Sequence, residues 1–477
     1  MPGTPRYAVI RYLGFAGAVL LAVAAYLGGA LPPLPRNANP VALAQHGNGG
    51  WVMLTWLLGT SLLVWAWWSA RYADPPIRWI YVTVGLWLLP LLVAPPLGSR
   101  DVYSYACQGA VYDAGGDPYT HGVAELGCPW LSTVTPMWRD TPAPYGPVFV
   151  LLAGAAVALG GTLWGSIALL RALTLIGVVL MALCVPALAR RCGVQPGRAL
   201  WLALACPLVA VHLVSGAHND ALMVGLLVAG LLVVAARPGH AGVLLAGGVL
   251  LGLAIAVKIT AVVVVPFAAL AAIPGPYRLP ALLRHGAWVA AGVVAALLGS
   301  TLASGLGLGW VAGLSHSGDS VQWTSPPTAL GIFIEYLGRP FGLRYHAVPV
   351  TRALGLVVLA VVLVVLWWRA RHRNPLFGAG LALAATVALA PVFHPWYATW
   401  PLAVLAATTE RIRWFVVPVA VACFLTLPDG NNLARFTKFQ GTLFMAILTV
   451  VIAYRGLRWA RAHRRAREAE RAGSAAR

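Results

Sequence analysis

The apolar residues of this chain form long stretches that short polar segments separate. About 20 consecutive apolar residues cross a bilayer as an α-helix, and on this basis the pattern predicts about fourteen transmembrane helices. Their expected positions are residues 12–31, 51–69, 79–97, 167–189, 199–215, 220–236, 241–257, 259–273, 286–304, 350–368, 376–392, 396–409, 412–428 and 439–456. The chain is therefore predicted to be an all-α polytopic membrane protein.

Two apolar segments do not follow this simple pattern. If the segment from Val148 to Leu163 crossed the membrane, Arg190 and Arg191 would lie outside. We therefore expect an interfacial or re-entrant helix in the preceding external loop, and a true span with an extra crossing elsewhere is the alternative. The apolar run over 241–273 has an arginine beyond each end, so we expect two short helices with a tight turn at residues 257–260 near the outer surface.

The composition agrees with a membrane protein, since 60% of the residues are hydrophobic and 10% are charged. The N-terminal part has Arg6 and Arg11 before apolar residues 13–31, which resembles a secretory signal. The proline-rich residues 32–35 follow in place of a small-residue cleavage site, so we expect a retained first helix.

The net charge of +20 does not point to nucleic acid, because the arginines are clustered between the apolar segments. Such clusters are typical of cytoplasmic loops, and they predict that both termini are cytoplasmic. The clusters are Arg71 and Arg78; Arg190, Arg191 and Arg198; Arg278 and Arg284; Arg369, Arg371 and Arg373; Arg411 and Arg413; and the tail from Arg455. The tail is also expected to touch anionic lipid headgroups.

This topology divides the chain into four parts. They are N-terminal transmembrane helices (1–97), an external loop with interfacial helices (98–166), a transmembrane core (167–456) and a basic cytoplasmic tail (457–477). Further external segments are expected at residues 215–220 and 305–348. The first external loop contains Cys107 and Cys128, for which a disulfide is plausible in an oxidising compartment; two independent buried thiols are the alternative.

Carboxylates are scarce, with thirteen Asp and Glu in 477 residues, and Asp101 directly follows an apolar segment that ends at Leu97. A partly desolvated carboxylate at a membrane face is suited to act as a general base toward a sugar hydroxyl. The alternative is an ordinary polar loop in which Asp101 caps a helix. No acid is adjacent to Asp101 and the nearest histidine in sequence is His121, so a metal cluster is not indicated.

Lys258 is one of two lysines in the chain and lies in the turn of the apolar run over 241–273. An unpaired ammonium costs about 3 kcal/mol in the bilayer on insertion scales, so an anionic partner is expected. That partner could be Asp101, Asp220 or the phosphate of a lipid that enters from the bilayer, and a purely structural ion pair is the plainer interpretation.

Three further polar groups lie at expected outer faces. His218-Asn219-Asp220 precedes a span, where a helix N-cap and a site role are both open. His394-Pro395-Trp396-Tyr397 combines a histidine with aromatic residues that are common membrane-interface anchors. His316, Asp319 and Trp323 give only a weak signal for contacts with a polar acceptor.

In its layout the chain resembles the GT-C glycosyltransferases, and most closely the actinobacterial polyprenol-phosphomannose-dependent α-1,6-mannosyltransferases. The resemblance covers about residues 97–397. Its matching pieces are Arg100-Asp101-Val102-Tyr103-Ser104-Tyr105 with Gln108-Gly109, Asp117-Pro118-Tyr119, Pro136-Met137-Trp138-Arg139-Asp140-Thr141-Pro142 with Tyr145-Gly146-Pro147, His218-Asn219-Asp220, Lys258 and His394-Pro395-Trp396-Tyr397. Many GT-C enzymes pair two acids at the catalytic position, whereas Arg100 precedes Asp101 here.

The resemblance implies an inverting transfer of mannose from polyprenyl-phosphate-mannose to a mannan or lipoglycan acceptor at the outer face of the plasma membrane. It implies Asp101 as the base, Lys258 and Arg139 at the donor phosphate, no cofactor and no metal ion. The residues that it implies for substrate binding are Tyr103, Asp140, Tyr145, His218, Asn219, Asp220, His394 and Tyr397.

Two alternative functions remain open at this level. Another GT-C specificity, such as arabinosyl or glucosyl transfer, is hard to separate because sequence alone distinguishes sugars poorly. A lipid-linked substrate transporter or flippase would also place charges such as Lys258 and Asp220 inside the membrane. Transporters often have paired inverted halves, and no second loop like that around Asp101 occurs in this chain.

Overall fold

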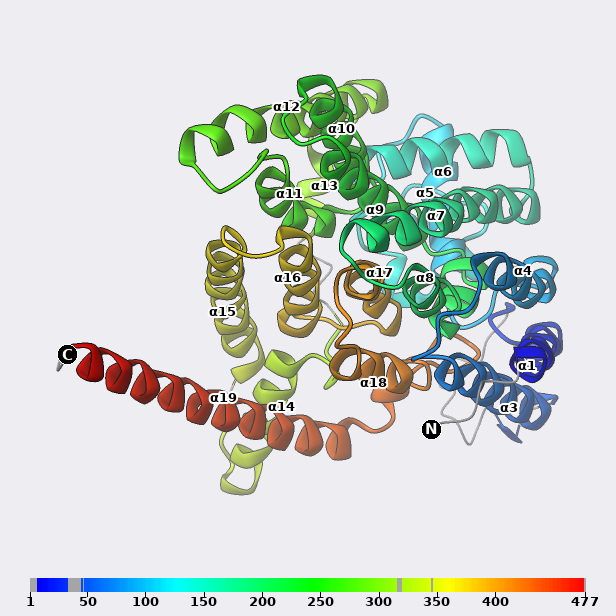
Figure 1. Cartoon of the computed structure of the whole chain (residues 1–477). Helices are drawn as coiled ribbons and strands as arrows, with labels where there is room; N and C mark the ends of the chain where they lie inside the picture. The colour runs from blue at the N-terminus through cyan, green and yellow to red at the C-terminus, as the bar shows by residue number, and fades with distance from the viewer. Residues whose placement is uncertain (1–6, 33–43, 46, 315–319, 345, 476–477) are drawn as a thin grey trace.

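The structure, a computed structural model, describes residues 7–32, 44–45, 47–314, 320–344 and 346–475, and within them it is a bundle of helices without a β-strand (Figure 1). The helices are α1 Tyr7–Leu27, α3 Gly49–Ser69, α4 Ile77–Val93, α5 Asp101–Asp113, α6 Pro147–Gly160, α7 Leu163–Arg191, α8 Pro196–Leu204, α9 Asp220–Ala236, α10 Ala241–Val257, α11 Val265–Ala271, α12 Leu279–Ser304, α13 Gly309–Gly313, α14 Pro326–Gly338, α15 Ala347–Ala370, α16 Pro375–Leu389, α17 Thr399–Thr408, α18 Arg413–Ala422 and α19 Lys438–Ala475. Short 3₁₀ turns are η1 Leu131–Thr133, η2 Pro136–Trp138, η4 Ile259–Val264, η6 Arg339–Phe341, η7 Pro395–Ala398 and η8 Leu433–Arg435, and Val209–Ser215 (η3) is a π-helix.

Six helices of the described chain are long and apolar enough to cross a membrane, which makes this a multi-pass membrane protein. They are α1, α3, α7, α12, α15 and the first part of α19. The remaining predicted spans correspond to shorter apolar helices such as α9 and α10, or to helix pairs. The total of fourteen crossings therefore stays a prediction.

The predicted span over 199–215 is broken, because α8 and the π-helix η3 meet at an angle of 60°. Pro207 lies in the break, and a proline has no backbone N–H with which to continue a helix. The helix observed at the predicted span over 412–428 is shorter than expected. Its helix α18 ends at Ala422, and the chain then folds back through a loop in which Thr426 and Asn432 form an isolated β-bridge.

Helix α6 forms a hairpin with α7 and lies against α5 (Figure 1). Gly161, with φ of 62°, and the N-cap Thr162 make the connection. The fourteen residues of α6 extend about 21 Å, which is less than the roughly 30 Å thickness of the hydrocarbon core. Its N-terminus contacts the turn after α10, where the Gly146 amide donates to the carbonyl oxygen of Val257 at 3.3 Å.

Helix α9 lies in the interior and contacts α7, α10, α11 and α17. It is apolar on all sides, as expected of a helix that is surrounded by others. Gly177 of α7 and Gly225 of α9 allow a close approach, because a Cβ atom on either would meet backbone atoms of the other helix. Packing of this kind buries the first residue of α9, Asp220, which has no exposed side-chain area.

Candidate active site

Asp101 is the first residue of α5, directly after a loop that the rest of the protein holds in place. The Gly98 amide donates to the carbonyl oxygen of Pro428 at 3.0 Å. Gly98 has φ of 71° and leaves no room for a side chain beside Val211. The Asp101 amide donates to the Ser99 hydroxyl at 3.1 Å. The Asp101 carboxylate is thus fixed at a helix start and retains 20% of its side-chain exposure.

His218 lies between two carboxylates. Its Nδ1 is 3.6 Å from Oδ2 of Asp101 and 4.0 Å from Oδ2 of Asp220. The Tyr105 hydroxyl is 3.4 Å from the same nitrogen. His218 is fully buried, and its Nε2 has no hydrogen-bond partner among the described residues. The side-chain oxygen and nitrogen of neighbouring Asn219 are also buried without a partner there, so both residues have polar atoms available for a ligand.

Lys258 pairs with Asp220. Its Nζ lies 2.9 Å and 3.0 Å from the two carboxylate oxygens, and the indole N–H of Trp400 donates to Oδ1 of Asp220 at 2.7 Å. The Lys258 ammonium also lies over the rings of Tyr397 and Trp400, at 4.7 Å and 5.3 Å from their centroids. Asp220 therefore serves as a counter-ion rather than as a helix cap, and of the three partners considered for Lys258 it is the one in contact.

Aromatic rings form one wall of this cluster. Trp396 stacks on His218 and on His394, with centroid separations of 4.1 Å and 4.6 Å. Tyr397 stacks on Trp400 at 4.2 Å. On the loop side the rings of Tyr105 and Tyr145 meet edge to face at 5.2 Å. Flat rings around polar groups are suited to hold a sugar, which has apolar C–H faces and polar edges.

Burial raises the pKa of Asp101, which lies outside the spanning segments, to about 6; Lys258 lowers this pKa and Asp220 raises it. Burial likewise lowers the pKa of His394 to about 3, and the charge of Lys258 acts in the same direction. At neutral pH Asp101 is then an ionised carboxylate with greater basicity than usual, and His394 is a neutral imidazole.

Several residues predicted for the site form no hydrogen bond or ion pair with this cluster in the described part of the chain. Arg139 donates from Nε to the Val134 carbonyl at 3.0 Å and from Nη2 to that of Ser132 at 3.4 Å. Asp140 is exposed to solvent. Tyr103 is buried with Arg100 near its ring, and its hydroxyl has no partner among the described residues. Trp323 donates to Thr437, while His316 and Asp319 lie outside the described residues.

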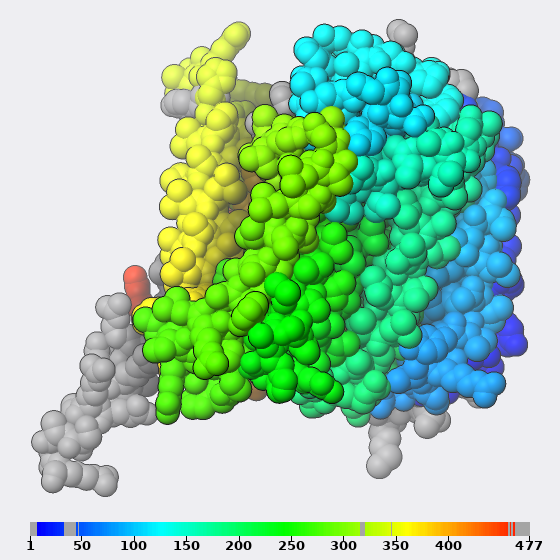
Figure 2. Space-filling model, turned by 90° about the horizontal axis from the view of Figure 1, so that it is seen from above, coloured from blue at the N-terminus to red at the C-terminus, as the bar shows by residue number. Residues whose placement is uncertain are grey.

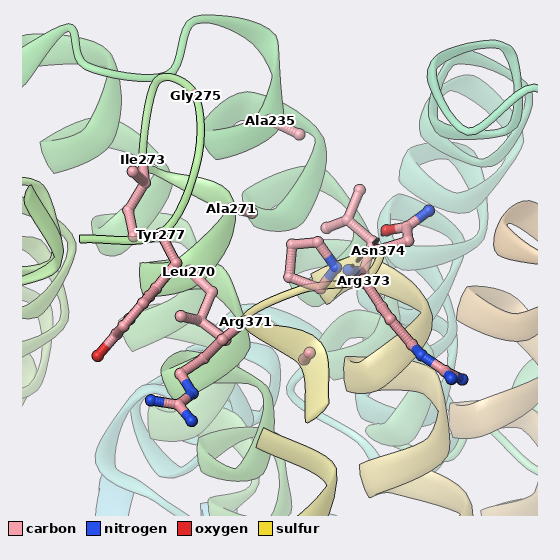
Figure 3. A pocket seen from close by; sticks show the side chains of 12 residues that line it. Ala235, Leu270, Ala271, Ile273, Gly275, Tyr277, Arg371, Arg373 and Asn374 are labelled. Atoms are coloured by element: carbon pink, nitrogen blue, oxygen red, sulfur yellow. Dashed lines mark hydrogen bonds between the residues drawn. The ribbon is translucent and has the colours of Figure 1, made fainter. Parts of the chain in front are cut away.

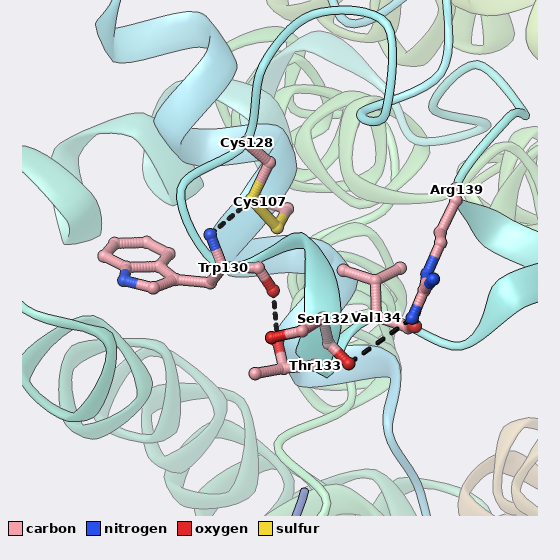
Figure 4. The surroundings of a disulfide bond; sticks show 7 residues. All are labelled: Cys107, Cys128, Trp130, Ser132, Thr133, Val134 and Arg139. Carbon is pink, nitrogen blue, oxygen red and sulfur yellow. Dashed lines mark hydrogen bonds between the residues drawn. A yellow bond between two sulfur atoms is a disulfide. The ribbon is translucent and has the colours of Figure 1, made fainter. Parts of the chain in front are cut away.

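Cys107 and Cys128 are joined by a disulfide, with Cα atoms 5.3 Å apart (Figure 4). The Trp130 amide donates to the sulfur of Cys128 at 3.2 Å. Both cysteines are buried with Val111, Val123 and Val134 in a small cluster of their own. The bond fastens the loop that carries Arg139 to the middle of α5, two turns beyond Asp101.

Two important residues were not predicted from the sequence. Trp400 follows Tyr397 by three residues, which is the spacing of one helical face, and this was a usable signal. Arg171 is a charged residue inside a predicted span, which was another. It is buried and donates to the carbonyl oxygens of Leu92, Ala94 and Ser215 at 2.9, 2.6 and 2.9 Å. In the described chain no three His, Cys, Asp or Glu side chains are grouped to hold a metal ion.

Two family descriptions match this chain. Residues 11–274 match the alpha-(1->6)-mannopyranosyltransferase N-terminal domain, and residues 327–455 match the MptB C-terminal domain. Curated relatives match over most of their length. An alpha-(1->6)-mannopyranosyltransferase of Mycobacterium tuberculosis is 32% identical over 94% of this chain and 88% of that protein. Alpha-(1->6)-mannopyranosyltransferase A of the same organism is 34% identical over 88% and 84%, and alpha-(1->6)-mannopyranosyltransferase B of Corynebacterium glutamicum is 30% identical over 91% and 79%.

Proposed function

The chain belongs to the alpha-(1->6)-mannopyranosyltransferase family and is a mannosyltransferase, and on this premise we propose that it transfers mannose from polyprenyl-phosphate-mannose to a mannan acceptor in α-1,6 linkage. Membership of the family confirms the resemblance predicted from the loop motifs. We further propose a GT-C architecture with the site at the outer face of the plasma membrane and both termini in the cytoplasm.

The observation that carries the proposal is the position of Asp101 near a half-buried cation, Lys258, which lowers its pKa. The carboxylate is partly exposed and its pKa is about 6. Nδ1 of His218 lies 3.6 Å from this carboxylate and 4.0 Å from Asp220, the ion-pair partner of Lys258. An acceptor hydroxyl needs a base as it attacks, and a leaving phosphate needs a positive charge. Asp101 would remove the hydroxyl proton while the hydroxyl oxygen attacks the anomeric carbon from the face opposite the phosphate, which gives inversion.

Lys258 would bind the donor phosphate without leaving Asp220. Two of its three ammonium hydrogens are sufficient for the two oxygens of Asp220, and 12% of its side chain is exposed. The remaining hydrogen can bond to a phosphate oxygen. As the sugar leaves, negative charge grows on that oxygen, so the interaction strengthens in the transition state. Arg139, held by loop carbonyls, would supply a second positive charge at the same group.

The sugars would be held by the remaining predicted residues. Neutral His394 and the rings of Tyr145 and Tyr397 offer stacking faces and hydrogen-bond groups, and the unpartnered atoms of His218 and Asn219 would bond to hydroxyls. Asp140 lies exposed on the loop, where it would meet the acceptor, and we assign Tyr103 the positioning of α5. Transfer of arabinose or glucose is the second candidate function. The relatives disfavour it, because they are named as mannopyranosyltransferases.

The test combines purified protein with radiolabelled polyprenyl-phosphomannose and a short α-1,6-mannoside, followed by linkage analysis of the product. The expected product carries one added α-1,6-mannose, and treatment with EDTA should leave its formation unchanged. The substitution Asp101→Asn should reduce transfer about 10²–10⁴-fold. The matched control is Asp113→Asn, which changes an exposed carboxylate of the same helix and should retain activity. A normal rate for Asp101→Asn, or a labelled donor moved across the membrane without transfer, would refute the proposal.

A further inference from the structure

A pocket of about 250 Å³ lies far from the candidate active site, between the turns that join α11 to α12 and α15 to α16 (Figure 3). Helix α9 begins at Asp220 and reaches the pocket at Ala235, which is 15 residues or roughly 22 Å farther along its axis. Helix α16 begins at Pro375 in the pocket wall, directly after its N-cap Asn374, and ends at Leu389, shortly before His394. The two sites therefore lie at opposite ends of the same helices.

The pocket has an apolar floor and a basic rim. Leu270, Ile273 and Leu376 contribute apolar side chains, while Arg371 and Arg373 come from the α15–α16 turn. Figure 3 shows Arg371 beside Tyr277 on one side and Arg373 beside Asn374 on the other. Such a site has room for the small anionic group of a ligand. An apolar part of the same ligand would cover the apolar side chains below it.

Aromatic residues hold Arg371 in position rather than a carboxylate. Its guanidinium carbon lies 3.2 Å from the ring centroid of Trp368 and 5.0 Å from that of Tyr277, and its Nε donates to the Trp368 carbonyl at 3.1 Å. Figure 3 shows the Arg371 guanidinium beside the Tyr277 ring at the edge of the pocket. An arginine that is oriented in advance loses little freedom when it binds an anion.

Protein carboxylates do not neutralise this rim within the described chain. Asp74 and Glu410 both interact with Arg198. Asp74 accepts a hydrogen bond from the Arg198 amide at 2.9 Å, and Glu410 forms an ion pair with the Arg198 side chain at 2.8 Å. Neither Arg371 nor Arg373 has an ion pair among the described residues. The positive charge of this rim is therefore available to an anion from outside the chain.

The surfaces beside the pocket are those of a lipid-facing protein. On α12 Leu279 and Leu283 are exposed, and on α15 Val364 and Trp368 are exposed. Figure 2 shows both helices on one face of the molecule, α12 in yellow-green and α15 in yellow, and α11 contacts each of them. Long acyl chains can lie against them, whereas a soluble phosphate compound cannot use this apolar area.

We propose that this pocket binds the phosphate headgroup of an anionic phospholipid, with the phosphate at the basic rim to which Arg371 and Arg373 belong and the acyl chains along α12 and α15. A headgroup there would join the turn after α11 to the turn before α16. It would act independently of mannose transfer, since no residue of the pocket belongs to the candidate active site.

The test uses the full chain in mixed micelles and native mass spectrometry to count bound dioleoyl-phosphatidylglycerol against dioleoyl-phosphatidylcholine. We expect the protein to retain the anionic lipid selectively, and Arg371→Gln/Arg373→Gln to bind it roughly tenfold more weakly. The control Arg284→Gln/Arg369→Gln removes the same charge from exposed positions of α12 and α15 outside the pocket, and it should bind within twofold of the unchanged protein.

A second variant tests the pocket without changing its charge. Ala235→Leu narrows the cavity from α9 and should also weaken retention of phosphatidylglycerol, while its melting temperature in phosphatidylcholine alone reports whether it is folded. Equal losses in the two double variants would mean general electrostatic attraction and overturn the proposal. Equal stabilisation by glycerol 3-phosphate and by phosphatidylglycerol, at the same phosphate concentration, would show a soluble-phosphate site and overturn it as well.

Discussion

At the scale of single residues, burial and two neighbouring charges set the pKa of Asp101. Because burial raises its pKa to about 6, it is ionised and able to act as a base above that pH and protonated below it. We therefore expect kcat/KM to fall about tenfold per pH unit below pH 6. Asp220 raises this pKa and Lys258 lowers it, so Asp220→Asn should move the acidic limb to lower pH. Steady-state rates between pH 4.5 and 8 measure both effects, and a limb that Asp220→Asn leaves in place would contradict the assignment.

Lys258 allows a second residue-level prediction that separates binding from folding. Lys258→Met leaves the buried Asp220 carboxylate unpaired, which costs about 3–5 kcal/mol, so folded yield should fall. The double variant Lys258→Met/Asp220→Asn removes both charges and leaves an oxygen for the Trp400 N–H, so yield should recover. If Lys258 binds the donor phosphate, the double variant should still have a raised donor KM and slower transfer. Recovery of both yield and donor KM would reduce Lys258 to a structural ion pair.

The sequence could identify the members of this cluster but not their partners. Asp101, Asp220 and Lys258 were each visible as polar groups beside apolar segments. Which carboxylate meets Lys258 depends on how α9, α10 and α17 pack, and those helices have few features that set their relative positions. Trp400 was missed for a related reason, because a tryptophan in an apolar segment is usually a packing or interface residue.

At the scale of elements, Arg171 of α7 connects this helix to two other helices, α4 and η3. Its three hydrogen bonds reach the end of α4 and the end of η3, and each bond from a charged group contributes about 1.5–3 kcal/mol. Arg171→Met should therefore lower the melting temperature strongly, with partial rescue by Arg171→Lys and an unchanged donor KM in the protein that folds. Arg190→Met, at an exposed position of the same helix, is the control. Similar melting curves for the two Met variants would contradict this role.

The disulfide gives a prediction for α5 and its loop. The cysteines are 21 residues apart, so loss of the bond should destabilise the protein by about 3 kcal/mol in the chain-entropy model. Cys107→Ser/Cys128→Ser should melt at lower temperature and transfer mannose more slowly, because the loop that follows Asp101 is no longer fastened. Cys184→Ser, at a free thiol of α7, is the control. Mass spectrometry that finds both thiols free in protein from its native compartment would contradict the bond itself.

The accuracy of the element predictions follows from how continuous the apolar segments are. The predicted ranges 220–236 and 241–257 coincide with α9 and α10, which polar residues bound at both ends. The range 199–215 was wrong as one helix, since an apolar run does not reveal a bend at Pro207. The range 439–456 agrees with the apolar part of α19, Lys438–Gly456, and the helix itself continues to Ala475 through charged residues that are good helix formers.

At the scale of the whole molecule, the two ends of the helical bundle differ in charge, and apolar helices lie between them. One end contains the scarce carboxylates that carry the proposed chemistry, and the other contains arginines such as Arg371 and Arg373. The positive-inside pattern predicts which end faces the cytoplasm. The same pattern predicts the number of crossings, because helices as short as α17 and α18 have no length that distinguishes a crossing from a buried element.

The bend between α8 and η3 has a consequence for biosynthesis. The nine residues of α8 extend about 14 Å, so neither half is a stable membrane segment when it leaves the ribosome. We expect residues 196–215 to remain on the cytoplasmic side until α9 has been made, and then to enter the membrane with it. A reporter that is active only outside should thus be exported poorly when fused after Ser215, and well when fused after Gly98. Equal export would show that the bent segment inserts unaided, and that its bend forms later, as the helices around it assemble.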